Sequence, residues 1–406
     1  MSKKNITIFG LGYIGLPTAA ILAESGHIVN GVDVSEDIVN GINNSKTHFF
    51  EPKLDELVTK NISNKNLKAS LNPNQSDIFI ICVPTPFKYE KDERIPDISF
   101  IQSAVSEIIK VIKPGDLIIL ESTSPVGTTD KIAKMVRSKI EDDKDIHYAY
   151  CPERVLPGNI VKELVENDRI VGGVNEISTK VAVDFYKTFV KGEIHATNAR
   201  TAEMCKLTEN SFRDVNIAFA NELSIICDKY DVNDRDLINL ANFHPRVNIL
   251  QPGVGVGGHC IAVDPWFLIS DLPEQTNLIK KSREVNLYKT QWVQDKIKES
   301  INLFVIKNNF EPTIACMGLT FKPNVDDMRE SPALIVAKEI SEECSNVILV
   351  EPHISNADLG LSKIDYALDN ADIFIFLVAH DCFAQDVVIK TIKEKSYLDF
   401  TGVIKL

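Results

Sequence analysis

Short apolar runs alternate with helix-length segments through the first half of the chain. Four runs, at residues 6–9, 28–32, 78–83 and 117–120, have the length and β-branched content of buried parallel strands. The segments between them are long enough for crossover connections. This alternation predicts a doubly wound α/β sheet.

The pattern changes near residue 200. Residues 201–230 contain no glycine or proline and are rich in alanine, glutamate, leucine, asparagine and isoleucine, which predicts one long helix. More helix is expected around residues 234–242 and 276–306, with a glycine-rich loop at 252–259 between them. Strand-like runs return at residues 313–317, 347–350, 373–378 and 397–400.

The fold class that follows is α/β, with two Rossmann-like doubly wound domains joined by a central helical domain that contains a long helix. We place the domains at residues 1–199, 200–306 and 307–406. A chain of 406 residues is long enough for two or three packed domains.

Charge and cysteine usage limit the partners. The net charge of -13 argues against nucleic acid or an anionic membrane surface as the main partner. The eight cysteines are scattered and form no C-x-x-C pair, which indicates reduced thiols in the cytoplasm. Residues 6–23 carry no charge, but glycines and a proline interrupt them. A strand, a turn and a helix explain this stretch better than a targeting or membrane segment.

The chain begins with a candidate dinucleotide site. Gly10, Gly12 and Gly15 form G-x-G-x-x-G directly after the first apolar run, with Tyr13 and Ile14 inside the motif. Asp33 ends the second run, 18 residues after Gly15, where a carboxylate would meet the ribose hydroxyls. Because Asp33 would repel a 2′-phosphate, NAD is favoured over NADP. The alternative is a glycine turn that only packs a helix on a strand.

A second candidate site lies in the middle of the chain. Cys260 ends the glycine-rich run and precedes Asp264, so the thiol could be activated as a nucleophile or be an inert core residue. Lys206 and Asn210 are four residues apart on the long helix and share a face, which could also be a solvated face. Glu153, in a proline-bracketed loop, could be a general base or a surface charge.

Together these residues resemble the UDP-glucose/GDP-mannose dehydrogenase family, through the glycine-flanked Cys260, Glu153 in its Pro-Glu loop, and Lys206 with Asn210. Residues 121–129 and 321–329 match further family blocks, and the resemblance runs in order through the whole chain. Residues 151–158, 201–224 and 244–267 are most similar to the branch of the family that acts on UDP-N-acetyl-D-mannosamine.

The resemblance implies an NAD-dependent oxidation of the C6 alcohol of a UDP-linked sugar to a carboxylate. Two hydrides leave in sequence, and the Cys260 thiolate traps the aldehyde as a thiohemiacetal that becomes a thioester. By family position, Lys206 and Asn210 stabilise the oxyanions, Glu153 is the general base, and Asp264 and Thr123 position water. The product suggests supply to a cell-surface polysaccharide.

The same resemblance assigns binding roles. We expect Thr85, Thr123 and Arg329 to join the glycine motif and Asp33 at the cofactor, and we expect no metal. The UDP-sugar would be bound by Lys206 and Asn210 together with Arg154, Val155, Leu156, Arg246, Asn248, Gly257, His259 and Lys322. The chain would form a homodimer along its long helix, with Arg246 reaching the sugar across the interface. The C-terminal domain has no G-x-G-x-x-G, so a second NAD site is not expected there.

Several alternatives stay open. His259 and Arg154 depart from the UDP-glucose pattern and favour an N-acetylhexosamine, but they do not separate the C2 epimers. UDP-N-acetylglucosamine and UDP-glucose are therefore the next candidate substrates. A single-step hydroxyacid dehydrogenase would have no use for Cys260. A dinucleotide-binding regulatory protein would not require Cys260, Lys206 and Glu153.

Overall fold

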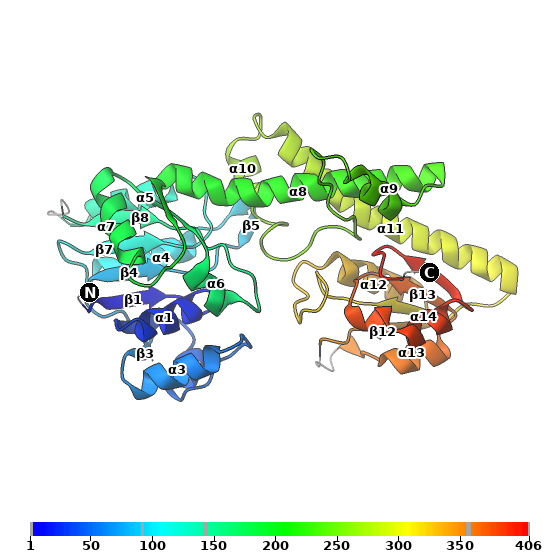
Figure 1. The fold of residues 1–406 in the computed structure, drawn as a ribbon, viewed down its shortest axis with the longest axis horizontal. Helices are drawn as coiled ribbons and strands as arrows, with labels where there is room; N and C mark the ends of the chain where they lie inside the picture. Colours follow the sequence, from blue (N-terminus) through cyan, green and yellow to red (C-terminus); the bar gives the residue numbers. More distant parts are fainter. Residues whose placement is uncertain (1–2, 91–92, 141–144, 355–358, 405–406) are drawn as a thin grey trace. The chain divides into compact units, whose positions relative to one another are not determined.

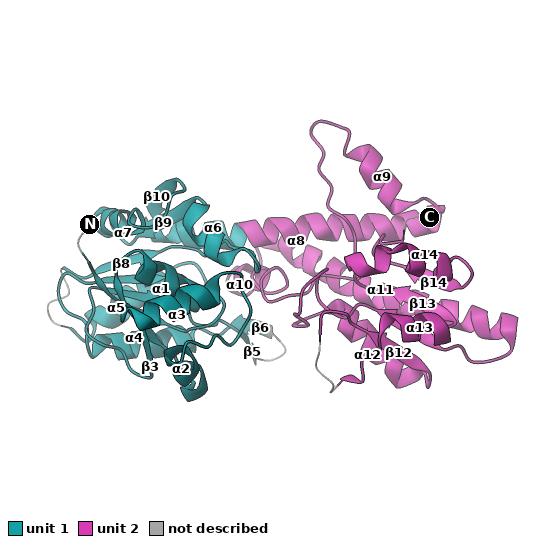
Figure 2. Ribbon diagram, turned by 60° about the horizontal axis from the view of Figure 1, so that its bottom comes forward, with its two compact units in different colours: residues 1–208 teal, residues 209–406 magenta. Residues whose placement is uncertain are grey.

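The computed structural model describes residues 3–90, 93–140, 145–354 and 359–404. The chain divides into two compact units, Met1–Thr208 and Glu209–Leu406 (Figure 2). This division places one boundary within the long helix. The three-domain boundaries drawn from the sequence stay a prediction.

An eight-stranded sheet forms the centre of the first unit, in the order β10-β9-β8-β7-β4-β1-β2-β3. Neighbouring strands are parallel except for β8 and β9, which are antiparallel. The strands are β1 (Asn5–Phe9), β2 (Ile28–Val32), β3 (Leu67–Ser70), β4 (Ile78–Ile81), β7 (Leu117–Leu120), β8 (His147–Tyr150), β9 (Arg169–Gly173) and β10 (Ile194–Asn198), and β5 (Phe87–Glu90) and β6 (Glu93–Pro96) form a separate hairpin. The four strands predicted here are confirmed as β1, β2, β4 and β7.

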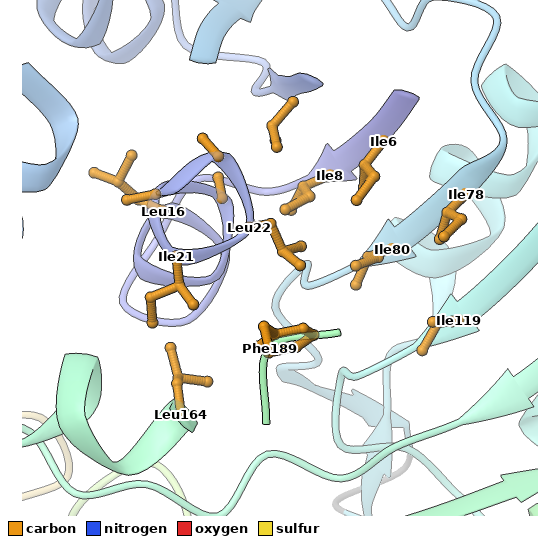
Figure 3. Close-up of a cluster of buried hydrophobic side chains, with 14 of the residues drawn as sticks. Ile6, Ile8, Leu16, Ile21, Leu22, Ile78, Ile80, Ile119, Leu164 and Phe189 are labelled. Carbon is orange, nitrogen blue, oxygen red and sulfur yellow. The ribbon is translucent and has the colours of Figure 1, made fainter. Parts of the chain in front are cut away.

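Helices cover both faces of this sheet, as Figure 1 shows. One face carries α1 (Gly15–Glu24), α2 (Glu36–Asn43), α3 (Leu54–Ser63), α6 (Ile160–Glu166) and α7 (Glu176–Tyr186), and the other carries α4 (Ser99–Ile109) and α5 (Thr128–Arg137). Alternate strand residues face the two layers: Ile78 and Ile80 pack on the α1 side, and Phe79 and Ile81 on the α4 side. Figure 3 shows the α1 side, where isoleucines of β1, β4 and β7 meet Leu16, Ile21 and Leu22.

The uncharged stretch at residues 6–23 is confirmed as a strand, a turn and a helix, because β1 is followed by the glycine turn and α1. Across the described parts of the chain, no helix has both the length and the apolar character that a membrane crossing requires.

The predicted long helix is α8 (Ala199–Tyr230), whose first residues belong to the first unit and whose remainder belongs to the second. The other helices of the second unit are α9 (Asp234–Ala241), α10 (Pro265–Asp271), α11 (Asn277–Asn308), α12 (Pro332–Glu343), α13 (Ile364–Asn370) and α14 (Asp386–Ile392), with a 3-10 turn at Asp381–Ala384. The expected helices around residues 234–242 and 276–306 are thus confirmed.

A four-stranded parallel sheet, in the order β12-β11-β13-β14, completes the second unit. Its strands are β11 (Ile314–Met317), β12 (Val347–Val350), β13 (Ile373–Phe376) and β14 (Ser396–Asp399). Side chains of α11 and α12 pack on one face, and side chains of α13 and α14 pack on the other. The predicted second α/β domain is confirmed.

Polar side chains, several of them fully buried, link α8 to α11. The pairs follow the same chain order along both helices, with Asp214 on Arg283, Asn221 on Asn286, Ser224 on Lys289 and Asp228 on Lys296. Gly253 also donates its N–H to the Asn221 side chain, so this network holds the start of the glycine-rich loop.

Candidate active site

The glycine turn after β1 divides its three glycines between packing and open space. A Cβ at Gly10, whose φ is +84°, would lie 2.7 Å from the Cys82 carbonyl oxygen, and one at Gly15 would lie 1.8 Å from the Gly10 oxygen. A Cβ at Gly12 would meet no atom within 4 Å. The outer glycines are therefore required by the chain's own backbone. The middle glycine leaves room at the N-terminus of α1 for a pyrophosphate.

Asp33 closes the same turn from the end of β2. Its carboxylate accepts hydrogen bonds from the N–H groups of Leu11 (2.9 Å) and Ser35 (3.0 Å). The chain order reverses at β1, which has β2 on one side and β4 on the other. The crevice at such a switch point is where doubly wound sheets bind dinucleotides. The residues present therefore fit NAD.

The remaining expected cofactor residues lie in different parts of the chain. Thr85 follows β4 and Thr123 follows β7, so both lie beyond the carboxyl ends of neighbouring strands, and both are half-buried. Tyr13 is exposed, and its ring centroid lies 4.4 Å from that of Phe49. Ile14 is half-buried just before α1. Arg329 belongs to the second unit.

Glu153 is a buried carboxylate just past the end of β8. Its Oε2 forms an ion pair with Arg169 Nη1 at 3.0 Å, and both side chains are under one-tenth exposed. Its Oε1 accepts the N–H of Arg154. Its backbone carbonyl accepts a hydrogen bond of 2.7 Å from Lys206 Nζ. The structure thus brings together Glu153 and Lys206, which are far apart in sequence, and adds Arg169, which sequence reasoning did not identify.

The loop that begins at Arg154 is held by two carboxylates. Glu51 accepts the N–H groups of Gly158 and Ile160, both at 2.8 Å, and Glu163 accepts that of Leu156. Val155 packs against the core while Leu156 is 53% exposed, so the loop presents an apolar side chain outward.

Arg154 is exposed and lines a cavity of about 360 Å³. The other lining residues are Asp168, Ile170, His195, Ala196, Thr197, Thr201 and Cys205. Neither Glu153 nor Lys206 is among them, so this cavity is not centred on the candidate catalytic residues of the unit.

The thiol lies in the second unit. Cys260 is half-buried in a turn, and its carbonyl accepts the N–H groups of Val263 (3.0 Å) and Asp264 (2.8 Å). The buried Asp264 carboxylate accepts a hydrogen bond from the buried Asn210 amide on α8. The structure therefore places Asn210 and Asp264 in direct contact, next to the segment that carries Cys260.

The glycines before Cys260 have a packing reason that the sequence did not reveal. A Cβ at Gly257 would lie 2.5 Å from the Glu330 oxygen, and one at Gly258, whose φ is +80°, would lie 2.8 Å from the Phe321 ring. Gly258 also donates its N–H to the Arg329 carbonyl. At Gly257 and Gly258, the space beside the backbone is filled by the chain's own residues 321–332.

The other candidate substrate residues are mostly exposed. Arg246, Asn248 and His259 are exposed, and the loop that carries the first two is closed by Asn242, whose side chain bonds both backbone groups of Ile249. Lys322 Nζ lies 5.6 Å from the Phe321 ring centroid. The half-exposed Arg329 guanidinium forms an ion pair with Asp327.

The second unit repeats the backbone geometry of the cofactor turn. Gly10 and Gly318 each follow a first strand with positive φ, and each donates its N–H over 2.8 Å to the last carbonyl of the second strand. The next N–H reaches the carboxylate after the second strand in both cases, Leu11 to Asp33 and Leu319 to Glu351.

The two carboxylates differ in what else they contact. Glu351 is 4% exposed and also binds the His380 ring at 3.1 Å and the N–H groups of Thr320 and His353. Its carboxylate is therefore held by several groups of the protein itself. That no second NAD binds in this unit stays a prediction.

Known proteins match the chain along nearly its whole length. Profiles of the UDP-glucose/GDP-mannose dehydrogenase family match residues 4–190 (NAD binding domain), 200–288 (central domain) and 315–406 (UDP binding domain). A UDP-N-acetyl-D-mannosamine dehydrogenase of Campylobacter jejuni is 52% identical over 400 residues, which cover 94% of this chain and 97% of the relative. An NDP-N-acetyl-D-galactosaminuronic acid dehydrogenase of Ralstonia nicotianae is 49% identical over 395 residues, which cover 94% of this chain and 92% of that relative.

Solved structures agree with these relatives. The structure of a UDP-D-ManNAc dehydrogenase from Pyrococcus horikoshii superposes with a TM-score of 0.90 at 38% identity, over 99% of this chain and 96% of that one. The expected family, the fold and the use of NAD are therefore confirmed. This chain belongs to the UDP-glucose/GDP-mannose dehydrogenase family, and its N-terminal unit contains the NAD binding domain of that family.

Proposed function

We propose that the chain oxidises the C6 alcohol of UDP-N-acetyl-D-mannosamine to the carboxylate, using two NAD molecules in sequence. The observation that carries this proposal is the 52% identity, over 94% of this chain, to the UDP-N-acetyl-D-mannosamine dehydrogenase of Campylobacter jejuni. The thiol, the carboxylate, the ammonium and the amide that a four-electron oxidation needs are all present, as Cys260, Glu153, Lys206 and Asn210.

Cys260 is the proposed covalent nucleophile. NAD, when bound at the glycine turn and Asp33, supplies the hydride acceptor. The Cys260 thiolate adds to the C6 aldehyde, and loss of the second hydride leaves a thioester on the same sulfur. Covalent attachment keeps the reactive aldehyde from leaving before the second oxidation.

Five polar residues have roles in the same reaction. Lys206 and Asn210, one helical turn apart on α8, stabilise the oxyanion that develops at C6. Glu153 accepts a proton from the water that hydrolyses the thioester. Asp264 orients the Asn210 amide through their hydrogen bond and, with Thr123, positions water.

Sugar and cofactor contacts complete the proposal. Arg154, Val155, Leu156, Gly257, His259 and Lys322 bind the UDP-sugar, and Thr85 and Arg329 join the cofactor site. Asn248 also binds the sugar, and Arg246 is assigned to the sugar from the neighbouring subunit of a homodimer in the cytoplasm. The exposed Phe212, Phe219 and Ile226 support this dimer, because their seven-residue spacing makes an apolar stripe along α8. Light scattering on the purified protein tests the oligomeric state.

The closest competing substrate is the N-acetylgalactosamine analogue. A relative named for N-acetyl-D-galactosaminuronic acid is 49% identical, only slightly below the mannosamine relative. The two sugars differ at ring carbons, and the residues that would distinguish them lie in the exposed 154–156 loop and at His259.

The test is the number of NADH molecules formed per sugar consumed. UDP-N-acetylmannosamine, UDP-N-acetylgalactosamine, UDP-N-acetylglucosamine and UDP-glucose are offered separately to the native protein and to Cys260→Ala. We expect two NADH per UDP-N-acetylmannosamine, the highest kcat/KM for that sugar, and no net acid formation in the variant. One NADH per sugar, or normal turnover by the variant, would contradict the covalent route. A higher kcat/KM for another sugar would change the substrate alone.

A further inference from the structure

The reversed strand β9 brings an early residue to the catalytic edge of the sheet. β8 and β9 pair antiparallel, with Ala149 opposite Gly173 and Tyr150 opposite Gly172. Each residue further along β8 corresponds to one residue earlier on β9, so three steps beyond Tyr150 place Glu153 level with Arg169. A parallel β9 would have brought its last residue to this edge. The direction of one strand thus explains why Arg169 meets Glu153.

The guanidinium of Arg169 is enclosed and directed at one carboxylate. Nη1 contacts Glu153 Oε2 at 3.0 Å, Nη2 donates to the Leu164 carbonyl at 3.1 Å, and the Arg169 side chain is 3% exposed. An arginine cannot lose its proton in a protein, so this buried cation is permanent. A permanent buried charge requires an opposite charge beside it, and the Glu153 carboxylate occupies that position.

A second carboxyl group lies in the field of the same cation. Glu121, just past the end of β7, accepts hydrogen bonds from the Tyr186 hydroxyl (2.6 Å) and the Cys82 thiol (3.3 Å). Burial raises the pKa of Glu121, and the nearby Arg169 opposes that rise. Burial also raises the pKa of the Cys151 thiol to about 12, so that thiol is neutral. Of the two carboxyl groups, Glu153 is the one in direct contact with the guanidinium.

The carboxylate of Glu153 is also fixed in direction. One oxygen is held by Arg169 and the other by the N–H of Arg154. Each carboxylate oxygen has a second lone pair, so a water can still be bound. A base that must accept a proton from water gains from being both ionised and held in place.

We propose that Arg169 is a positioning residue for thioester hydrolysis, which holds Glu153 as an oriented carboxylate. The inference rests on the proposed function. In this step Glu153 takes a proton from water, the oxygen adds to the thioester carbon, the carbon–sulfur bond breaks, and the Cys260 thiolate leaves. No electrons are exchanged. The two hydride transfers precede this step. We therefore expect loss of Arg169 to slow release of the acid while the first-turnover burst of NADH is kept.

The experiment compares native protein with Arg169→Met and Arg169→Lys under rapid mixing with NAD and UDP-N-acetylmannosamine. Arg200→Met is the matched control, because Arg200 forms an exposed ion pair with Asp130. For Arg169→Met we expect a rapid burst of two NADH per subunit and then a steady rate at least 10-fold below native. Intact-protein mass should show the sugar acyl group on the enzyme, and hydroxylamine should remove it. Arg169→Lys should fall between Met and native, and the control should match native.

A purely structural role predicts a different pattern. Burst and steady rate would then fall together, with no acyl-enzyme, and that result would overturn the proposal. If Arg169→Met does not fold, Arg169→Lys decides, and an unchanged ratio of burst to steady rate would reject the role. Native protein that yields fewer than two NADH per sugar would instead reject the proposed function.

Discussion

Asp214 on α8 and Arg283 on α11 form an ion pair at 2.7 Å in which the two side chains are 0% and 1% exposed. Asn286 also donates to the Asp214 carboxylate, at 2.8 Å. Two charges removed from water in this way contribute little net stability when both are present, but either one alone is very unfavourable.

Loss of one partner of this pair should therefore cost much more than loss of both. We expect Asp214→Ala to lower the free energy of unfolding by about 3–5 kcal/mol, because Arg283 is left buried without a counter-charge. The double variant Asp214→Leu/Arg283→Met should recover most of that loss. Urea unfolding measures all three proteins. A double variant as unstable as the single one would show that the pair itself, and not the uncompensated charge, determines the stability.

A second buried cation should make stability depend on pH. Burial lowers the pKa of Lys289 from 10.5 to about 7, although it donates a hydrogen bond to Ser224. Between these two values the unfolded chain binds the extra proton, so the free energy of unfolding should rise with pH from about 7 to 10.5, by at most about 5 kcal/mol. Urea unfolding at several pH values measures this slope. Lys289→Met should flatten it, while Lys280→Met, at an exposed position, should leave it unchanged.

Alanine at two glycines of the cofactor turn, Gly12 and Gly15, should have different effects on folding and on NAD binding. Gly12→Ala should fold normally and weaken NAD binding at least 10-fold, because the new Cβ enters the open space where the pyrophosphate lies. Gly15→Ala should lower the melting temperature, since its Cβ collides with the Gly10 oxygen. Gly41→Ala, where the nearest atom is 3.5 Å away, is the control. Calorimetric titration with NAD and thermal melts separate the effects, and a Gly12→Ala protein with native affinity would contradict the assignment.

Variants of Asp33 and Glu351, the carboxylates at corresponding positions of the two sheets, should differ in their effect on NAD binding. We expect one NAD bound per chain. Asp33→Ala should raise the KM for NAD at least several-fold, and Glu351→Ala should leave it unchanged while lowering the melting temperature, because Glu351 bonds only to the protein's own groups in the described structure. Steady-state kinetics at saturating sugar and calorimetry measure both. Two NAD per chain would show that the second unit retains a cofactor site.

The sequence predicted the elements whose apolar pattern is unambiguous. β4 and β7 are continuous apolar runs, β1 has three apolar residues among its five, and α8 is a long segment without glycine or proline, so hydrophobic burial and helix propensity alone locate them. β9 begins with Arg169 and ends in two glycines, and β8 begins with His147, so neither presents such a run. No local pattern encodes the direction in which β9 pairs.

The site was predictable to the extent that each residue belongs to a local motif. The glycine turn, Asp33 and the segment around Cys260 could be recognised from spacing. Arg169 could not be recognised in this way, because its role depends on an ion pair with Glu153, which the pairing of two strands brings about. The glycine-rich run with Gly257 and Gly258 could be recognised from the sequence. The reason for these two glycines could not, since the atoms that leave no room for a side chain there come from residues 321–332.

The pairing of Glu153 with Arg169 has a consequence for how the family diversifies. Residues 154–168 leave the sheet at one member of the ion pair and return at the other, so the segment is fastened at both ends. Its exposed side chains, Arg154 and Leu156 among them, can change in sequence without breaking the ion pair at its ends. The proposed sugar contacts of this segment can therefore vary while Glu153 keeps its fixed direction.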